Sequence, residues 1–248
     1  MTDRSPLPNP TDLWQATLQW QPPEDLQARF DQLYGAIVAI NQTLNLTRIT
    51  SPEDFWEKHL WDSLQGVVPG LGEDTAAAPL SVIDIGTGGG FPGLPLALMF
   101  PCWTVTLMDA TRKKIAALQQ VSEQLGLDNV RFLAERAEQV AHQPIYRESF
   151  DLALLRAVGP TNTCAEYALP LLRLGGQALL YRGQWSAQEE DDLRAILPCL
   201  GGQLNQVQAM TTPITQGIRH NVWMDKVSRS PDKFPRLPGI PAKSPLAP

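Results

Sequence analysis

Residues 82 to 93 read Val82-Ile83-Asp84-Ile85-Gly86-Thr87-Gly88-Gly89-Gly90-Phe91-Pro92-Gly93, an apolar run that ends in an acidic residue and passes directly into a glycine loop. Together with the apolar residues of 94 to 100, this pattern predicts a strand, a tight turn and a short helix. Glycines at 86, 88 and 90 can take positive φ angles and let the backbone approach a ligand, because they carry no Cβ. We therefore expect the loop to hold a nucleotide-like cofactor at the start of a βαβ unit.

The spacing of the glycines leaves two cofactors open. Residues 88 to 93 satisfy G-x-G-x-x-G, the dinucleotide pattern, and Asp109 follows about 20 residues later, where an acid would accept ribose hydroxyls. NAD and S-adenosylmethionine both fit this spacing. Asp84 completes D-x-G-x-G-x-G, which resembles the first motif of class I methyltransferases. This favours the methyl donor, whose ammonium group we expect the Asp84 carboxylate to face.

Length and composition indicate one α/β domain with an appendage. The chain has 248 residues and a formal net charge of −6. No apolar run approaches a membrane span and the N-terminus has no hydrophobic signal region, so we expect a cytoplasmic protein without a membrane partner. The three cysteines lie far apart in the sequence and fit neither a disulfide framework nor a zinc site, so no metal is expected.

The charge is unevenly distributed along the chain. Residues 1–80 hold eleven acidic and four basic side chains, whereas residues 219–248 hold six basic and two acidic ones. A basic, proline-rich tail is often a solvated terminus. It equally suits a phosphate backbone, where each Lys or Arg contact adds salt-dependent affinity.

Apolar periodicity divides the chain into four regions. Helical spacing predicts a helix from about Glu24 to about Leu44, and Ser51 is placed to cap a second helix that runs to about Val67. Residues 70–79 are a glycine- and alanine-rich linker. The predicted regions are a mobile N-terminus (1–22), an N-terminal helical extension (23–79), the main domain (80–228) and a basic proline-rich C-terminal tail (229–248).

Strands and helices alternate in the main domain. Residues 172–180 read as a helix end, a Gly-Gly turn and a strand, which resembles the entry to the fifth strand of class I methyltransferases. Alternation predicts a doubly wound parallel sheet with helices on both faces and a ligand at the carboxyl ends of the strands, where Asp84, Asp109 and Arg156 fall. Strands are predicted over 80–85, 103–109, 129–133, 150–155, 177–182, 204–210 and 219–227, with helices between the first five.

Several residues after these strands are candidates for the site. Asp109 is expected to accept the ribose hydroxyls, the alternative being an N-cap for the helix that begins near Arg112. The basic side chains of residues 112–114 face either phosphate or solvent. After the third strand, a main-chain N–H of Ala137 or Glu138 is placed to bind the adenine edge, while the Glu138 side chain is either involved or simply exposed.

Arg156 follows an apolar strand and should meet an anion, which is the donor's carboxylate, an RNA phosphate or a protein acid. The residues Leu155-Arg156-Ala157-Val158 include no Pro-Cys nucleophile and no Asn-Pro-Pro-Tyr or Asp-Pro-Pro-Tyr motif, which disfavours covalent pyrimidine methylation and exocyclic amine methylation. A ring nitrogen such as guanine N7 needs only positioning, so no general base is expected and the catalytic residue stays unassigned. His59 either stacks on RNA or is a structural histidine.

The whole pattern resembles the glucose-inhibited-division-B family, the bacterial small-subunit ribosomal RNA methyltransferases. The resemblance covers roughly residues 24–248. It rests on Asn45-Leu46-Thr47, on His59 with Asp62 and Ser63, and on I-D-I-G-T-G-G-G-F-P-G-L-P-L, L-M-D-A-T-R-K-K, R-A-E, L-L-R-A and the closing P-G-I-P-A-K-S-P-L.

This resemblance implies a seven-stranded Rossmann-like fold and a cytoplasmic enzyme that methylates guanine N7 in 16S rRNA. Its partner would be that RNA or the small ribosomal subunit, and we expect it to act as a monomer. The donor contacts implied are Gly86, Phe91, Asp109, Ala110, Thr111, Ala137, Glu138 and Arg156, to which the glycine motif adds Asp84 and Gly88. An NAD-dependent oxidoreductase and a ribosome-assembly protein that holds the cofactor structurally remain as alternatives.

Overall fold

The computed structural model describes residues 5–70 and 78–248. In these ranges, seven strands form one sheet in the order β3-β2-β1-β4-β5-β7-β6. The pairs among β1 to β5 are parallel, whereas β7 pairs antiparallel with both β5 and β6. The expectation of a fully parallel sheet is therefore wrong at this edge. The strands are β1 (Ser81–Ile85), β2 (Thr104–Met108), β3 (Val130–Leu133), β4 (Phe150–Arg156), β5 (Leu172–Arg182), β6 (Gly202–Thr211) and β7 (Ile218–Lys226).

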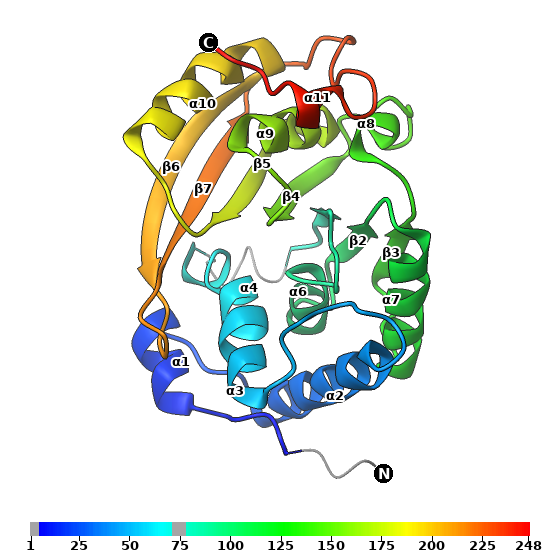
Figure 1. Cartoon of the computed structure of the whole chain (residues 1–248), viewed down its shortest axis with the longest axis vertical. Helices are drawn as coiled ribbons and strands as arrows, with labels where there is room; N and C mark the ends of the chain where they lie inside the picture. Colours follow the sequence, from blue (N-terminus) through cyan, green and yellow to red (C-terminus); the bar gives the residue numbers. More distant parts are fainter. Residues whose placement is uncertain (1–4, 71–77) are drawn as a thin grey trace.

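Helices cover both faces of the sheet, as the alternation predicts (Figure 1). The central strands β1 and β4 are almost wholly apolar because each is buried from two sides, and two separate clusters of apolar side chains fill the two layers. One layer holds α2 (Glu24–Asn41), α6 (Gly93–Met99) and α7 (Arg112–Gln124), and the other holds α8 (Ala137–Val140), α9 (Thr161–Ala168) with the 3-10 turn η3 (Leu169–Leu171), and α10 (Ala187–Leu200).

The N-terminal segment contains a helix, α1 (Thr11–Leu18), that packs on the protein. Trp14 is fully buried, with its ring centroid 4.9 Å from that of Trp56 in an edge-to-face arrangement, and Trp61 Nε1 donates to Thr17 Oγ1 at 2.9 Å. The prediction of a mobile N-terminus is thus wrong for residues 11–18. The periodicity missed this helix because it is short and buries only Trp14 and Leu18.

The second predicted helix is present but irregular. Ser51 Oγ accepts from Asp54 N at 3.3 Å, which confirms the N-cap. The helix runs through α3 (Pro52–Phe55), the π-helix η1 (Trp56–Trp61) and α4 (Asp62–Leu64), and is followed by a 3-10 turn, η2 (Val68–Gly70). The widened turn carries His59. Most of the expected linker lies outside the described residues.

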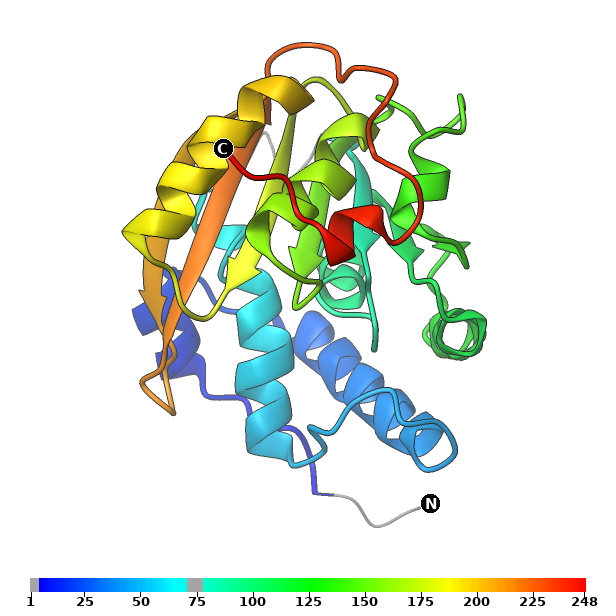
Figure 2. The same cartoon turned by 45° about the horizontal axis from the view of Figure 1, so that its top comes forward.

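The C-terminal segment folds back over the second layer of helices. It carries α11 (Ile240–Lys243), which lies against α9 (Figure 2). Most of its basic side chains are exposed, yet its backbone is held along its length by hydrogen bonds to the domain, so a freely solvated tail is wrong for this segment. Strand β5 begins at Leu172, five residues earlier than predicted. Gly175, within this strand, has a positive φ of 78°. Among the described helices, none is long and apolar enough to cross a membrane.

Candidate functional site

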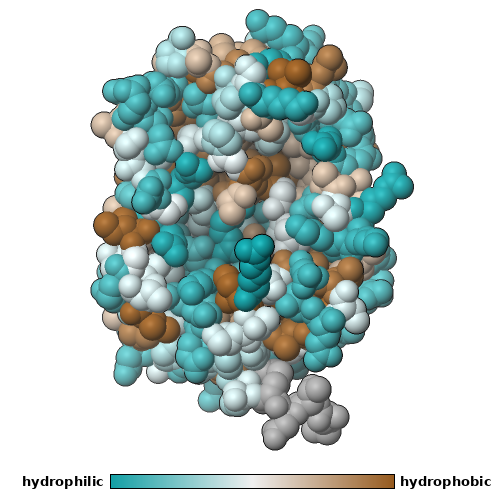
Figure 3. Space-filling model, viewed as in Figure 1, coloured by the Kyte–Doolittle hydropathy of each residue, from teal (hydrophilic) through white to brown (hydrophobic). Residues whose placement is uncertain are grey.

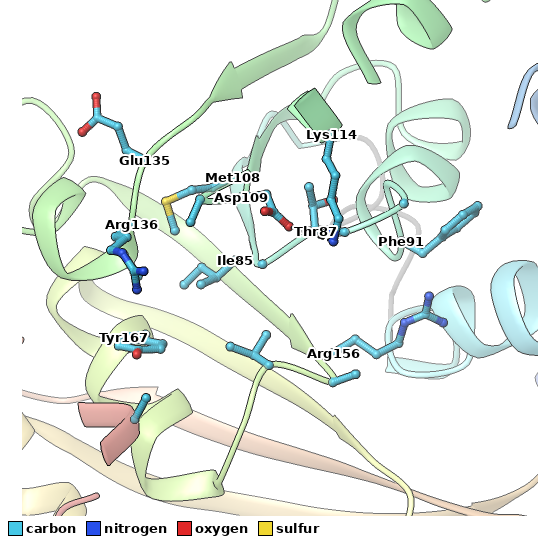
Figure 4. A pocket seen from close by; sticks show the side chains of 18 of the residues that line it. Ile85, Thr87, Phe91, Met108, Asp109, Lys114, Glu135, Arg136, Arg156 and Tyr167 are labelled. Carbon is cyan, nitrogen blue, oxygen red and sulfur yellow. Dashed lines mark hydrogen bonds and ion pairs between the residues drawn. The ribbon is translucent and has the colours of Figure 1, made fainter. Parts of the chain in front are cut away.

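A cavity of about 540 Å³ opens at the carboxyl ends of the parallel strands, where the alternating pattern predicts a ligand. Figure 3 shows this face hollowed near its centre and bordered mostly by hydrophilic residues, and Figure 4 shows the lining side chains. Eight of the ten predicted site residues line it. The lining includes Gly86, Gly88, Phe91, Asp109, Ala110, Ala137, Glu138 and Arg156 from the predicted set, whereas Asp84 and Thr111 are not part of it.

The glycine loop has the predicted conformation. Gly86, Gly88 and Gly90 all have positive φ angles, of 71°, 58° and 92°. A Cβ on Gly90 would lie 2.5 Å from Leu94 Cδ1, whereas a Cβ on Gly88 would meet only Gly86 O at 3.8 Å and would otherwise project into open space. The loop therefore needs Gly90 for helix packing, while Gly88 leaves room on the cavity side.

Asp109 joins the end of β2 to this loop. Its Oδ2 accepts from Gly88 N at 3.1 Å and its Oδ1 from Thr111 N at 2.8 Å, while Lys114 Nζ lies 4.0 Å from Oδ2. The N-cap position of α7 is Thr111, so Asp109 is not itself the cap. Its side chain keeps 12% exposure at the edge of the cavity, which leaves carboxylate surface for a ligand.

Asp84 lies beneath the loop and not in the cavity. Its Oδ2 accepts from Thr87 Oγ1 at 2.6 Å and from Gly93 N at 2.9 Å, and its Oδ1 has no hydrogen-bond partner among the described residues. Burial raises the pKa of this carboxyl to about 6. The prediction that Asp84 faces a donor's ammonium group is not supported, because the carboxylate fixes the two ends of the glycine loop instead.

Arg156 has a protein acid as partner, one of the three alternatives open from the sequence. Its Nη1 donates to Asp62 Oδ2 at 2.9 Å and to Lys58 O at 2.7 Å, and its Nη2 donates to His59 Nδ1 at 3.3 Å. Arg219 Nε approaches the other Asp62 oxygen at 3.4 Å, so two guanidinium groups share one carboxylate. A guanidinium has five N–H donors, and these contacts use three of them.

His59 holds the ring of Phe91, which lines the cavity. Its ring stacks on Phe91 with centroids 4.0 Å apart, and Figure 4 shows the Arg156 guanidinium directed towards Phe91 and η1. Because Arg156 only donates, His59 Nδ1 accepts and Nε2 carries the proton to Thr47 Oγ1 at 2.8 Å. Burial and the neighbouring Arg156 lower the pKa of His59 to about 3. His59 is therefore a neutral structural residue, the second of the two readings open for it.

The opposite end of the cavity is closed by residues that sequence reasoning treated differently or missed. The Glu138 side chain is 3% exposed, which excludes the simply exposed alternative. Its Oε1 accepts from Tyr167 Oη at 3.2 Å and from Gly239 N at 2.8 Å. Burial and the adjacent Glu138 raise the pKa of Tyr167, which keeps its hydroxyl protonated as a donor. Tyr167 and Ala242 also line the cavity. No local motif marks Tyr167, whereas Ala242 lies in the closing P-G-I-P-A-K-S-P-L motif but was not predicted to be a site residue.

The described residues include no group of three or more His, Cys, Asp or Glu side chains that could hold a metal ion. The polar residues that line the cavity include the acids Asp109, Glu135 and Glu138, the cations Lys114, Arg136 and Arg156, the hydroxyls of Thr87 and Tyr167, and the glycine loop. This set matches an elongated ligand with hydroxyl, amine and carboxylate groups.

Comparisons with known proteins agree with this geometry. Residues 26–220 match the model of the GidB family, described as rRNA small subunit methyltransferase G. The protein named ribosomal RNA small subunit methyltransferase G from Trichormus variabilis is 50% identical over 97% of this chain and 98% of its own length. Its counterpart from Gloeobacter violaceus is 49% identical over 94% of this chain and 91% of its length.

Solved structures resemble the fold at lower identity. An antibiotic-resistance methyltransferase, Kmr, has a TM-score of 0.51 at 16% identity, over 61% of this chain and 88% of its own. A 16S rRNA (adenine(1408)-N(1))-methyltransferase from Catenulisporales acidiphilia has a TM-score of 0.51 at 14% identity, over 63% of this chain and 89% of its own. At these identities the likeness concerns the fold alone.

Proposed function

The chain belongs to the GidB family of rRNA small subunit methyltransferases G, and we propose that it transfers the methyl group of S-adenosylmethionine to N7 of a guanine in 16S ribosomal RNA. The observation that carries the proposal is the cavity at the strand ends, where a glycine loop, a strand-end carboxylate and a strand-end arginine meet. The relatives that match nearly the whole chain are named for methylating small-subunit ribosomal RNA.

The residues of the cavity fit the parts of this donor. Asp109, with open carboxylate surface at the end of β2, would accept the ribose hydroxyls. Ala137 and Glu138 would hold the adenine at the start of α8. Gly86 and Gly88 would cradle the methionine portion, whose carboxylate would take the remaining N–H donors of Arg156. Phe91, fixed by His59, would pack against the methyl end.

The residues around the methyl end align the two reactants. They do not abstract a proton. When bound, S-adenosylmethionine supplies an electrophilic methyl group, and guanine N7 has an in-plane lone pair that needs no deprotonation. His59 is no general base because both of its ring nitrogens are engaged, and Asp84 is turned into the loop. The chain therefore contributes alignment of the two reactants, which is proximity catalysis. Arg156 is a positioning residue in this scheme.

The RNA would approach from the side of the cavity mouth. Arg112 and Lys113 are exposed at the start of α7, next to the lining residue Lys114. Cations at a helix N-terminus are unfavourable for the helix dipole, so their placement is better explained by contact with phosphate. With a net charge of −6 overall, binding must rely on such local patches. We propose the cytoplasm as the location and a monomer as the active form.

Small ribosomal subunits that lack the modification, incubated with donor labelled in its methyl group, test this function. We expect label in the 16S rRNA of the small subunits, and none in 23S rRNA when large subunits are put through the same assay. Equilibrium dialysis against S-adenosylmethionine and NAD accompanies the assay, because retention of NAD alone would favour an oxidoreductase. Donor binding without transfer to any ribosomal RNA would favour a ribosome-assembly protein and would contradict the proposal.

A further inference from the structure

The C-terminal strap, residues 234–246, runs over the second layer of helices (Figure 2). Phe234 is buried in the apolar cluster at its start, and Leu246 packs against the same cluster at its end. Between them the strap forms α11, and Ala242 on this helix lines the cavity. The strap lies outside the part of the chain that the family model matches, residues 26–220.

A buried ion pair clamps the strap to α9. Glu166 is 0% exposed, and its carboxylate accepts from Arg236 N at 2.7 Å, from Arg236 Nε at 2.9 Å and from Arg236 Nη2 at 2.7 Å. Thr163 Oγ1 donates to Pro241 O at 2.8 Å, and Asn162 Nδ2 donates to Leu246 O at 2.7 Å. Side chains of one helix thus fix the path of the strap at three points, which a solvated tail would not need.

One carboxylate joins the strap to the floor of the cavity. Glu138 Oε1 accepts both Gly239 N, at 2.8 Å, and Tyr167 Oη, at 3.2 Å. Gly239 begins α11 with a positive φ of 84°, which directs its amide towards α8. Three segments far apart in the sequence, namely α8, α9 and the strap, therefore meet at Glu138. Figure 4 shows α11 beside Tyr167 at this end of the cavity.

We propose that the strap is the adenine-side wall of the donor pocket, and that Gly239 is a positioning residue that holds the Glu138 carboxylate for the exocyclic amine of adenine. This inference rests on the proposed donor site. Docking of the strap and binding of the donor are then linked, because each stabilises the same position of Glu138. An amine donates to a carboxylate, whereas the carbonyl of hypoxanthine does not, so the pocket should prefer adenine.

The double variant Glu166→Gln with Arg236→Met tests the linkage without leaving a buried charge unpaired, and neither residue lines the cavity. Calorimetry with S-adenosylhomocysteine should show at least a tenfold weaker Kd than the wild type. The wild type should also bind S-adenosylhomocysteine at least tenfold tighter than S-inosylhomocysteine, and the variant should lose most of this preference. Lys233→Met is the matched control, because it removes an exposed cation next to the strap, and it should bind as the wild type does.

Hydrogen exchange on the unmodified protein provides a second test that does not depend on a variant folding. S-Adenosylhomocysteine should slow exchange in residues 234–246 at least fivefold and leave β6 unchanged. If the ligand binds but neither the strap's exchange nor the variant's affinity and adenine preference changes, the strap is not part of the pocket. The inference would also be wrong if the only change in the double variant were a shallower salt dependence of its activity on RNA. Failure of the wild type to bind S-adenosylhomocysteine would instead reject the donor site itself.

Discussion

Asp109 has a structural role in the protein and a proposed role in ligand binding, and a carboxylate can serve both because it has several lone pairs. It orders the glycine loop and the start of α7 through Gly88 N and Thr111 N. It also presents its remaining surface to the cavity. The sequence predicted the second function from the position of an acid one βα unit after the loop, whereas the hydrogen bond to Gly88 depends on tertiary structure and has no local signal.

Asp109→Ala should weaken binding of S-adenosylhomocysteine by about 1–3 kcal/mol, because two ribose hydroxyls would lose a charged acceptor. Asp109→Asn is the comparison, since the amide oxygen can still accept from Gly88 N while the charge is lost. Calorimetry at fixed salt gives both affinities, and thermal unfolding checks that each variant is folded. Equal affinity in wild type and Asp109→Ala would remove this residue from the ribose site.

Asp84 should make the protein less stable as the pH rises. Its folded pKa of about 6 lies above the ordinary aspartate pKa of 3.8, so between these values the native state holds a proton that the unfolded chain has released. The free energy of unfolding should therefore fall by about 3 kcal/mol from pH 4 to pH 7 through this residue. Above about pH 7 the loss is complete, because both states are then ionised.

Urea unfolding of Asp84→Asn and wild type at pH 4 and pH 7 isolates this contribution. The wild type should lose more unfolding free energy between the two pH values than Asp84→Asn does. His59→Gln provides a control of opposite sign, because the folded pKa of about 3 means that His59 favours the native state increasingly up to pH 6.5. If the difference in unfolding free energy between Asp84→Asn and wild type is the same at pH 4 and pH 7, the pKa of Asp84 is not raised in the folded protein.

The individual elements show where sequence reasoning succeeds. The seven strands and the helices between the first five were predictable because buried strands of an α/β sheet are short continuous apolar runs between glycine and proline signals. The antiparallel direction of β7 was not, since a strand buried on both faces has the same composition in either direction. The π-helical turn at His59 likewise depends on packing against Phe91, which lies 32 residues later in the sequence.

The partners of the site residues were harder to predict than the residues. Arg156 was expected to meet an anion, but its partner Asp62 comes from the N-terminal extension, 94 residues away. Glu138 is held by Gly239, 101 residues away. Such pairs are set by the docking of whole elements, and a single sequence carries no signal of them.

The glycine loop should not tolerate a side chain on its cavity side. Gly88→Val should abolish measurable binding of S-adenosylhomocysteine, because Gly88 has a φ of 58° and a β-branched side chain both strains this conformation and fills the space for the ligand. Gly126→Val is a matched control, because Gly126 has a φ of 62° and open space around it at the end of α7. It should cost similar stability but keep full affinity. Binding by a folded Gly88→Val would mean that the loop is only a turn.

At the scale of the whole molecule, charge separates binding of RNA from binding of the donor. The chain has a net charge of −6, so its attraction to RNA must come from local clusters such as Arg112 and Lys113. Each phosphate contact releases counterions, whereas the small donor makes few such contacts.

Methyl transfer to small subunits at subsaturating concentration should therefore fall steeply as salt rises from about 50 to about 200 mM. The affinity for S-adenosylhomocysteine should stay nearly constant over this range. Replacing Arg112 and Lys113 together with Ala should make the dependence shallower, and the same change at the remote Arg194, which pairs with Glu190 on α10, should not. If the salt dependence of the Arg112 and Lys113 variant equals that of the wild type, these two side chains face solvent and do not contact RNA.

The identity of the methylated atom distinguishes base-free transfer to guanine N7 from the alternatives. Small subunits lacking the modification are incubated with the enzyme and S-adenosylmethionine, and the 16S rRNA is then reduced with borohydride and cleaved with aniline, which breaks the chain only at N7-methylguanosine. We predict one new cleavage site in 16S rRNA, dependent on both enzyme and donor, and a single-turnover rate that stays flat from neutral to alkaline pH. Incorporation of the methyl group without aniline cleavage, or a rate that rises with the ionisation of a base, would contradict base-free transfer to guanine N7.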